Sequence, residues 1–501
     1  MISFFEYKQM HDAMVNRFFV LILSVVFLVL ISACHLFKPE LRDPPREIIP
    51  ERYSIFSTKA EPATKWWEDF GSEELNALLG TAFSDNLTLK EAWTRLKQTR
   101  FLSEKAESAF YPDLNGFATG LHGRKKISSD TTDSTSSFED YTIGLTSNYE
   151  VDLWGRVRSE YQARALDAEA TKEELYAAAI TLSAEITRNW IRIISQRMQK
   201  QLLQKQLDNN RIILDLIQFR FQRGMVSVLD VFQQKQVVEN IMAEIPLVEE
   251  TEQLLIHELA VLLGKPSISS VEIQQQTLPD FPKIPGIGLP ADLLQMRPDI
   301  RAAGLRLQAA DWQVAAARAN RLPAIRLTAS AQYGGAEMDA LLDNWLLSLA
   351  AGLSAPIFNG GQRKAEVERT RAVADENVIH YKRTVLAAIK EVEDALVRER
   401  KQKEHILALE RVYATADSTF NEAIGRYRNG LNDYLPVLTQ LLLVQSLERN
   451  LIQRRTALLE ARIAMYRALG GTWVGNLQME GLENNEIHQG NLNHDGKPEI
   501  Q

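Results

Sequence analysis

The chain has 501 residues, of which 45% are hydrophobic and 24% are charged, and its formal net charge is −8 at pH 7. This acidic balance argues against nucleic acid as a partner, because binding to phosphates needs a basic face. After the N-terminal segment, no run of about 18 apolar residues occurs, the length that a membrane-spanning helix needs. We therefore expect any crossing of a bilayer to be made by strands.

The N-terminal residues predict export and lipidation. A hydrophobic run over 18–31 follows Arg17, which is typical of a signal peptide. The sequence Ile31-Ser32-Ala33-Cys34 resembles a bacterial lipoprotein signal, in which a peptidase cuts before the cysteine and its sulfur receives a diacylglycerol. Cys34 is the only cysteine, so an internal disulfide is excluded. We expect residues 1–33 to be a signal peptide and Cys34 to carry a covalent lipid.

The neighbours of Cys34 refine this prediction. His35 stands where an aspartate often retains lipoproteins at the inner membrane, which favours the outer membrane. The alternative is an uncleaved anchor beside an accidental cysteine, and Met14 is an alternative start to Met1. Residues 34–65 are rich in proline and predict a lipid-anchored extended tether.

The sequence after the tether contains an internal repeat with an offset of 206 residues. About 110 residues align at this offset without an insertion. We expect two structural repeats, 66–270 and 271–475, each with a helix, a β-hairpin and a long helix hairpin. Four pairs of residues carry the alignment: Gly155 and Gly361, Glu185 and Glu391, Gly224 and Gly430, Gly264 and Gly470.

Alternating residues predict four strands. In 325–333 and 347–355 apolar residues alternate with polar or small ones, the segment 141–151 does the same, and 113–123 alternates weakly. One apolar and one polar face are typical of a strand between lipid and water. The stretch 124–138 is rich in Ser, Thr and Asp and predicts an exposed, mobile loop.

The number of strands predicts an oligomer. A strand with one face in lipid must have both edges hydrogen-bonded, because an unpaired amide in hydrocarbon costs several kcal/mol. Four strands cannot close a barrel, since the smallest known barrels have about eight. We expect several copies to share one barrel, and three copies would supply about twelve strands.

Long stretches without glycine or proline predict the helices. Helical spacing covers 73–109, and 156–223 predicts one helix of about 100 Å, with a similar partner over 362–424. The last helix has a coiled-coil seam that packs it against its neighbours, and residues 476–501 predict a disordered tail. The seam residues are Leu435, Leu438, Leu442, Ile452, Leu459, Ile463 and Tyr466, with breaks at Gln445, Arg449 and Thr456.

No enzymatic site is predicted. The segment from His257 begins like a zinc protease helix, but Val261 stands where the second histidine ligand is needed. Gly264-Lys265 lacks the upstream glycine of a phosphate loop, and Pro266 replaces the Ser or Thr. We expect no catalytic residue, no metal and no cofactor beyond the lipid on Cys34.

Five motifs, in their order along the chain, carry a family resemblance: Trp66-Trp67-Glu68-Asp69-Phe70, Asn86-Leu87-Thr88-Leu89, Tyr149-Glu150-Val151-Asp152-Leu153-Trp154-Gly155-Arg156, Arg297-Pro298-Asp299-Ile300 and Pro356-Ile357-Phe358-Asn359-Gly360-Gly361. In these motifs and in its duplication, over about residues 34–475, the chain resembles the TolC-like outer membrane efflux proteins. Within that family it is most similar to the lipidated (NodT/OprM-like) branch that serves resistance-nodulation-division (RND) pumps.

The resemblance implies a mainly α, mixed α/β membrane protein. It implies a homotrimer with a twelve-stranded β-barrel, four strands per chain, continued by a long α-helical barrel through the periplasm. It further implies docking to a periplasmic adaptor (membrane fusion) protein and, through it, to an inner membrane RND-type transporter. The implied function is a passive exit duct in the cell outer membrane for drugs or other small toxic compounds.

In this family the helix-turn-helix tips form the closed periplasmic end and meet the adaptor. Here the tips are at Gly224 and Gly430, where glycine tolerates positive φ. By position, Asp230 and Tyr427 match the family's gate residues, and Arg428 is a further candidate. The alternative is that these are solvated turn residues.

The sequence departs from its relatives beside the second tip. Pro436 and Thr439 stand where relatives often carry aspartate rings, and Asn432 replaces an arginine, although Asp433 lies nearby as a gate candidate. These departures put cation selectivity at the tip in doubt.

Three alternative functions are compatible with parts of the sequence. A protein-secretion duct would share the architecture, and the lipoprotein signal argues mildly against it. A periplasmic coiled-coil adaptor or scaffold would explain the helix hairpins, but it would not need amphipathic strands such as 325–333. A lipoprotein enzyme is disfavoured by the missing site.

Overall fold

The computed structural model describes residues 41–42, 49–54, 65–129, 132–267, 271–282, 284–471 and 473–476. The predicted signal peptide, Cys34, most of the tether and the tail after 476 lie outside the described residues. The chain forms two compact units, and each draws on both halves of the sequence. The first comprises Met1–Pro44, Lys97–Thr171 and Ala303–Tyr381, and the second comprises Pro45–Leu96, Lys172–Ala302 and Lys382–Gln501.

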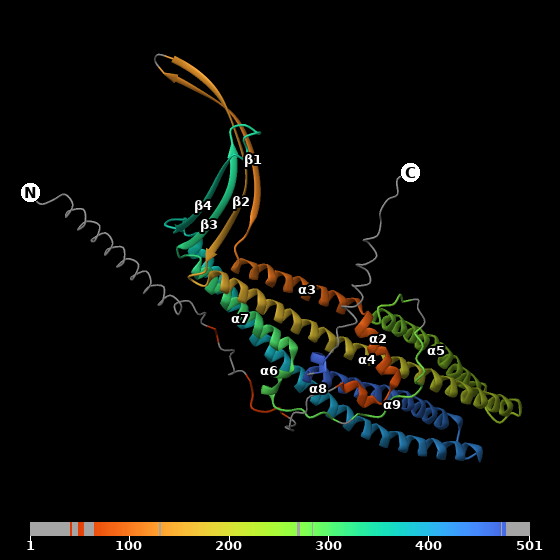
Figure 1. Ribbon diagram of the computed structural model, residues 1–501. Helices are drawn as coiled ribbons and strands as arrows, with labels where there is room; N and C mark the ends of the chain where they lie inside the picture. The colour runs from red at the N-terminus through yellow and green to blue at the C-terminus, as the bar shows by residue number, and fades with distance from the viewer. Residues whose placement is uncertain are drawn as a thin grey trace, which may run out of the picture. The chain divides into compact units, whose positions relative to one another are not determined.

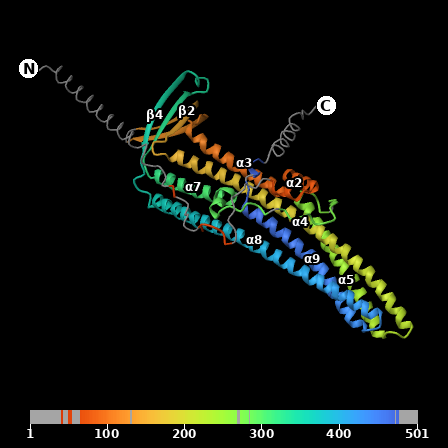
Figure 2. The same ribbon diagram turned by 90° about the horizontal axis from the view of Figure 1, so that it is seen from below.

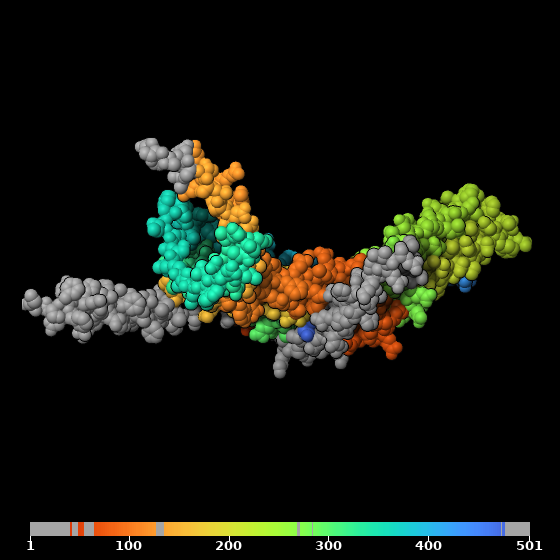
Figure 3. Space-filling model, turned by 45° about the horizontal axis from the view of Figure 1, so that its top comes forward, coloured from red at the N-terminus to blue at the C-terminus, as the bar shows by residue number. Residues whose placement is uncertain are grey.

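The first unit contains a four-stranded antiparallel sheet (Figure 1). Its strands follow one another in chain order: β1 (Asn115–Ser129), β2 (Thr132–Val151), β3 (Ala324–Gly335) and β4 (Asn344–Ser354). The strands predicted over 141–151, 325–333 and 347–355 are confirmed. In the space-filling view of Figure 3, the orange and teal segments of the sheet border a hollow.

The loop predicted over 124–138 is wrong. The β1–β2 ladder continues from Asn115 opposite Thr146 to Ser129 opposite Thr132, so most of the segment is strand. Serine and threonine favour turns only weakly, and threonine fits a pleated surface well once a partner strand supplies the backbone hydrogen bonds. The composition of the segment was therefore a poorer guide than the pairing.

One face of the sheet is apolar and exposed. Ile143 pairs with Tyr333, and Tyr333 pairs with Trp345, so these three side chains share a face. Leu347, Leu349 and Leu353 lie on the same face of β4 and are 69%, 83% and 71% exposed. The opposite face carries Asn148, Glu150, Arg326, Thr328, Ser330 and Ser348.

The two longest helices have equal lengths and the predicted offset. Helix α4 covers Arg156–Gln222 and α8 covers Gln362–Arg428, 67 residues each, so both bounds differ by 206. Their return helices, α5 (Val228–Leu262) and α9 (Tyr434–Leu469), complete two hairpins that lie side by side near their turns (Figures 1 and 2). The long helices are confirmed, while the boundary between the two repeats stays a prediction. Among the described residues, no helix is long and apolar enough to cross a membrane.

The core of the second unit gathers the predicted motif Trp66–Phe70 around the two hairpins. The Trp66 ring stacks on Tyr466 with centroids 5.1 Å apart, and Trp67 meets Trp473 edge-on at 4.6 Å. Trp190 of α4 is fully buried in the same cluster. The remaining elements are α2 (Glu73–Asp85), α3 (Leu87–Glu107), α6 (Leu293–Met296) and α7 (Pro298–Ala319), with short 3-10 turns at Trp66–Phe70, Ser108–Phe110, Pro290–Asp292 and Trp473–Asn476.

The helix predicted over 73–109 is divided at Asn86. The Asn86 side chain accepts a hydrogen bond from the Leu89 amide at 2.9 Å, which caps α3, and donates to the Leu262 carbonyl at 2.8 Å. An asparagine that competes with the helix for backbone partners ends α2 and starts α3.

Parts of the tether contact the folded units. In the first unit the Arg42 amide donates to Asp311 Oδ2 at 2.9 Å, and its guanidinium donates to Asp375 at 2.5 Å. In the second unit Tyr53 is 5% exposed, and the Ser54 amide donates to Glu393 at 2.8 Å. These segments after Cys34 are held by specific polar contacts.

Candidate functional site

The two helix turns that the sequence places at a gate have the same backbone. Gly224 has φ 69° and Gly430 has φ 72°. In each turn the amide after the glycine donates to a carbonyl five residues earlier, Met225 to Arg220 and Leu431 to Arg426, both at 2.9 Å. A Cβ at either glycine would meet no atom within 4 Å. Glycine is needed for its positive φ rather than for space.

Asp230 is part of the start of α5. Its carboxylate accepts from the Ser227 amide and hydroxyl, both at 3.0 Å, and its own amide donates to Ser227 Oγ at 3.3 Å. This capping box satisfies two amides that helix geometry leaves unpaired. The carboxylate therefore has a structural task within the protomer in addition to any task at a gate.

Tyr427 is buried between the two hairpins. It is 6% exposed, its ring lies 5.6 Å from the Tyr434 ring, and the Arg220 guanidinium lies 4.5 Å above it. Burial raises the pKa of Tyr427, while Arg220 lowers it and the charge of Asp230 raises it further. The structure thus brings two predicted gate residues, Asp230 and Tyr427, into one electrostatic cluster.

The other predicted gate residues stand apart from this cluster. Arg428 ends α8 and is exposed, and within the described part of the chain it has no hydrogen bond or ion pair. Asp433 is the N-cap residue of α9, but its side chain makes no capping hydrogen bond. Pro436 and Thr439 are exposed on the first turns of α9. The gate roles of Arg428 and Asp433 stay predictions, whereas Pro436 and Thr439 are the two departures from the relatives and were not predicted to act at the gate.

A buried polar chain, not predicted from the sequence, lies beside Tyr427. We use this name for Tyr434, Gln234, Asn210 and Gln206. Tyr434 Oη donates to Gln234 Oε1 at 2.6 Å, and Gln234 Nε2 donates to the Asn210 carbonyl and side-chain oxygen at 2.9 and 3.0 Å. Asn210 in turn donates to the Gln206 carbonyl at 2.7 Å. Gln234 and Asn210 are both 0% exposed.

The polar chain joins the two hairpins of one protomer. Gln206 on α4 donates to the Gln445 carbonyl at 3.2 Å and to Glu448 at 2.8 Å, and it accepts from Arg449 at 2.8 Å. Farther along α9, Thr456 donates to Ser195 Oγ at 2.7 Å. The three breaks in the apolar seam of the last helix are therefore the positions that contact α4. These breaks were the feature of the sequence that could have indicated polar contacts between the hairpins.

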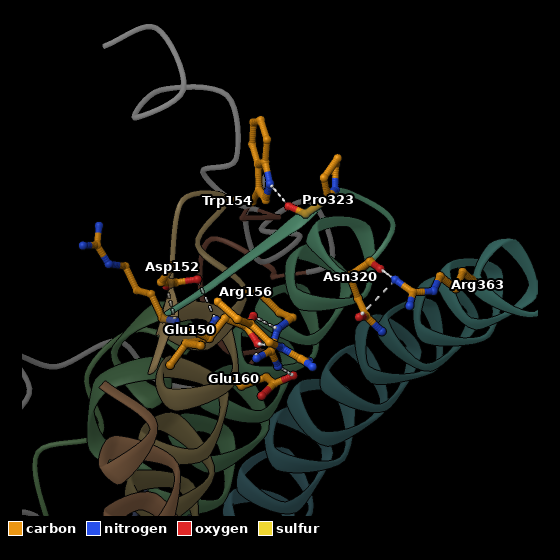
Figure 4. A network of polar contacts seen from close by, with 11 residues as sticks. Glu150, Asp152, Trp154, Arg156, Glu160, Asn320, Pro323 and Arg363 are labelled. Carbon is orange, nitrogen blue, oxygen red and sulfur yellow. Dashed lines mark hydrogen bonds and ion pairs between the residues drawn. The ribbon is translucent and has the colours of Figure 1, made fainter. Parts of the chain in front are cut away.

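The motif 149–156 forms the junction between β2 and α4 (Figure 4). Asp152 accepts from the amides of Val157 and Arg158 at 2.9 and 2.8 Å and so caps α4. The Trp154 indole donates to the Pro323 carbonyl at 2.6 Å, and Arg156 Nε donates to Glu150 at 2.9 Å. All of these residues belong to the first unit.

The motif 297–300 ties the start of α7 to α8 and α9. The Arg297 side chain is 10% exposed and donates to Asp299, to Glu391 at 2.9 Å and to the Ala468 carbonyl at 2.9 Å. Arg297, Asp299 and Glu391 line a cavity of about 520 Å³ in the second unit. Among the described residues, no group of three or more His, Cys, Asp or Glu side chains could hold a metal ion.

Comparisons with known proteins cover both halves of the chain. Residues 78–265 and 289–471 match the family profile of the outer membrane efflux proteins. The pyoverdine export outer membrane protein OpmQ of Pseudomonas aeruginosa is 30% identical over 435 residues, which are 84% of this chain and 90% of OpmQ. The toluene efflux pump outer membrane protein TtgF of Pseudomonas putida is 27% identical over 465 residues, 90% of this chain and 96% of TtgF.

The solved structure of the outer-membrane channel OprN resembles the fold with a TM-score of 0.81 at 25% identity and covers 87% of this chain and 100% of the OprN chain. The sequence matches and the fold agree over most of the length. The chain therefore belongs to the outer membrane efflux protein family and functions as an efflux channel in the outer membrane.

Proposed function

We propose that three copies of this chain form the exit duct of a tripartite efflux pump. The duct passively conducts drugs or other small toxic compounds from a periplasmic adaptor and an inner membrane RND-type transporter to the exterior. Its energy comes from these partners, so the protein itself performs no chemistry and needs no metal or cofactor. Cys34 carries the lipid that anchors each copy.

The edges of the sheet support the trimer most strongly. In the described part of the chain, β1 and β4 each pair with only one strand. All eleven residues of β4 are exposed, including Trp345, Leu347 and Leu349. In lipid, open edges with an apolar face are unstable, because backbone amides find no water there. Pairing of β4 with β1 of the next copy satisfies both edges and gives twelve strands in three copies.

The named relatives support efflux rather than protein secretion. OpmQ is named for pyoverdine export, and TtgF is named as part of a toluene efflux pump. Both are outer membrane proteins of export systems for small molecules. We propose the same task for this chain, together with the need for adaptor and transporter partners. We do not assign pyoverdine or toluene to it as the exported compound.

Assembly in membranes tests the proposal directly. Leu349→Lys places a charge on the apolar face of β4, where it costs about 2–4 kcal/mol in mid-bilayer, and should abolish the heat-modifiable trimer in outer membrane extracts. Ala350→Lys places the same charge on the opposite face of the same strand and should leave the trimer intact. If both variants assemble normally, or if the purified wild-type protein is a monomer that never conducts in planar bilayers, the proposed duct is wrong.

A second experiment concerns the gate. Asp230→Ala combined with Tyr427→Phe should weaken the contacts at the tips and raise single-channel conductance in planar bilayers. Thr439→Ala, on an exposed turn of α9 that makes only a local hydrogen bond to Leu435, is the matched control. An unchanged conductance in the double variant would remove Asp230 and Tyr427 from the gate.

A further inference from the structure

A small polar cavity lies where the sheet meets the helices of the first unit. It has a volume of about 240 Å³ and is lined by the ends of β2, β3 and β4 together with the first residues of α4 and α8. Its charged lining residues are Glu150, Asp152, Arg156, Arg326 and Arg363. Figure 4 shows that Arg156 turns back toward Glu150, while Arg363 reaches from α8 toward Asn320.

Strand register places the cavity on the polar face of the sheet. Glu150 is opposite Arg326, and Ala324, two residues before Arg326, is opposite Ser354, so these lining residues from three strands share one face. One step farther along that face, Thr328 donates to Asn148 Oδ1 at 3.2 Å. In the duct proposed above, this face borders the water-filled passage.

The two carboxylates of the cavity already have cationic or dipolar partners. Asp152 accepts from the first amides of α4, where the helix dipole favours a negative charge. Glu150 accepts from Arg156 at 2.9 Å. The negative charge of each carboxylate is therefore already compensated in part, and neither can fully neutralise another cationic side chain.

Two guanidinium groups keep unused donors. The Arg326 side chain is 68% exposed, and its Nε lies 3.8 Å from Glu150 Oε2, too far for a hydrogen bond. Arg363 contacts the neutral oxygens of Asn320. Each guanidinium has five N–H donors in a planar fork that matches a carboxylate or phosphate. Arg156, the third arginine of the lining, is already paired with Glu150 and, outside the lining, with Glu160 at 3.0 Å, so Arg326 and Arg363 are the cationic groups available to a ligand.

We infer that this cavity is a transient binding site for the carboxylate or phosphate groups of anionic compounds in transit, with Arg326 and Arg363 as its ligands. The inference rests on the proposed duct and specifies the class of compound that the duct favours.

Block of single-channel current by citrate, a small tricarboxylate, tests the site. Citrate should reduce the current of the wild-type channel in a concentration-dependent way. The double variant Arg326→Gln, Arg363→Gln should raise the half-blocking concentration about tenfold, as expected for the loss of roughly one charge-assisted contact. Arg158→Gln removes the same kind of charge from an exposed position outside the cavity lining. Citrate should block this control variant at the same concentration as the wild type.

The outcomes separate this site from the duct itself. A channel that conducts but is not blocked by citrate, or is blocked equally in the wild type and the double variant, overturns the anion site and leaves the duct intact. Equal loss of block in the Arg158→Gln control also overturns it, because the effect would then come from net charge alone. A protein that never conducts overturns both proposals.

Discussion

The two helix turns of each protomer share a backbone and differ in chemistry. Gly224 and Gly430 adopt nearly the same positive φ, and the hydrogen bonds donated by each glycine amide and by the amide after it have equivalent acceptors in the two turns. At the 206-residue offset, however, Ser227 corresponds to Asp433, and Asp230 corresponds to Pro436. Only the first turn has a capping box. Duplication has thus kept the geometry of the turn while the side chains diverged.

The neighbouring helix positions differ in the same way. Phe221 of the first turn is 43% exposed, whereas its counterpart Tyr427 is 6% exposed and packs on Tyr434. Gln234 is fully buried in the polar chain, whereas its counterpart Gln440 is half-buried on α9. In each of these two pairs only one member is buried, so the duplicated hairpins pack differently although their turns share a backbone.

The largest effect is expected at the buried polar chain. Gln234→Ala leaves the Tyr434 hydroxyl without its acceptor and Asn210 Oδ1 without the donor that Gln234 supplies, in a fully buried place. We expect a loss of about 3 kcal/mol in the free energy of unfolding, because buried polar groups without partners are costly. Thermal unfolding, followed by circular dichroism at fixed protein and detergent concentration, measures the loss.

Gln440→Ala is the matched control, since it makes the same change at the equivalent position of the other hairpin. Gln440 has no hydrogen bond within the described residues, so we expect a change within about 0.5 kcal/mol. Equal losses in the two variants would show that the polar chain does not distinguish the hairpins.

The shared backbone predicts equal effects at the two glycines. Gly224→Ala and Gly430→Ala each force an L side chain into the left-handed region, at a cost of about 1–2 kcal/mol. Because neither Cβ would meet another atom, backbone strain is the whole effect. The two melting temperatures should fall by the same amount, and a clear difference would mean that the turns are not equivalent in the assembled protein.

Some of this architecture could be predicted from the sequence and some could not. The long helices could be predicted because no glycine or proline interrupts 156–222. The two faces of the strands could be predicted because apolar and polar residues alternate along them. The loop prediction over 124–138 failed because strand pairing, which composition does not reveal, outweighed local turn preference. The break at Asn86 was missed because one side chain decided it.

The candidate site shows the same limit. The positions of the turn glycines followed from the repeat, because positive φ is a property of one residue and its backbone. The polar chain could not be predicted from the repeat. The partner of Gln234 is Tyr434, 200 residues farther along the chain, and their contact depends on how the hairpins pack. Only the polar breaks in the seam of the last helix, Gln445, Arg449 and Thr456, pointed to such contacts.

A smaller effect is expected at the caps. Asp230→Ala removes the acceptor of the Ser227 amide and hydroxyl, and loss of such a cap costs about 1 kcal/mol. Asp433→Ala removes a side chain that makes no capping hydrogen bond, so we expect no more than about 0.5 kcal/mol. Unfolding midpoints of the two variants, measured side by side, should rank in that order. The reverse order would show that Asp433 gains a partner only in the assembled channel.

The smallest effect is the dependence of stability on alkaline pH. Burial raises the pKa of Tyr434, and the nearby Tyr427 and Asp230 add to the rise. An unfolded tyrosine loses its proton near pH 10, so above that pH the unfolded chain gives up a proton that the folded chain retains. The contribution of Tyr434 is therefore complete below about pH 10 and is lost as the pH rises toward the folded value. Between pH 9 and 10.5 this amounts to about 0.8 kcal/mol.

Tyr434→Phe isolates this contribution, because phenylalanine has no proton to lose. The variant starts from a lower stability, since Gln234 loses its donor, but its unfolding free energy should fall less steeply over the same pH range. Tyr111→Phe changes a tyrosine that is 69% exposed and should keep the wild-type slope. Parallel slopes for all three proteins would mean that Tyr434 becomes accessible to solvent in the folded state. The packing of the second hairpin against Gln234 would then be looser than the contacts in a single protomer indicate.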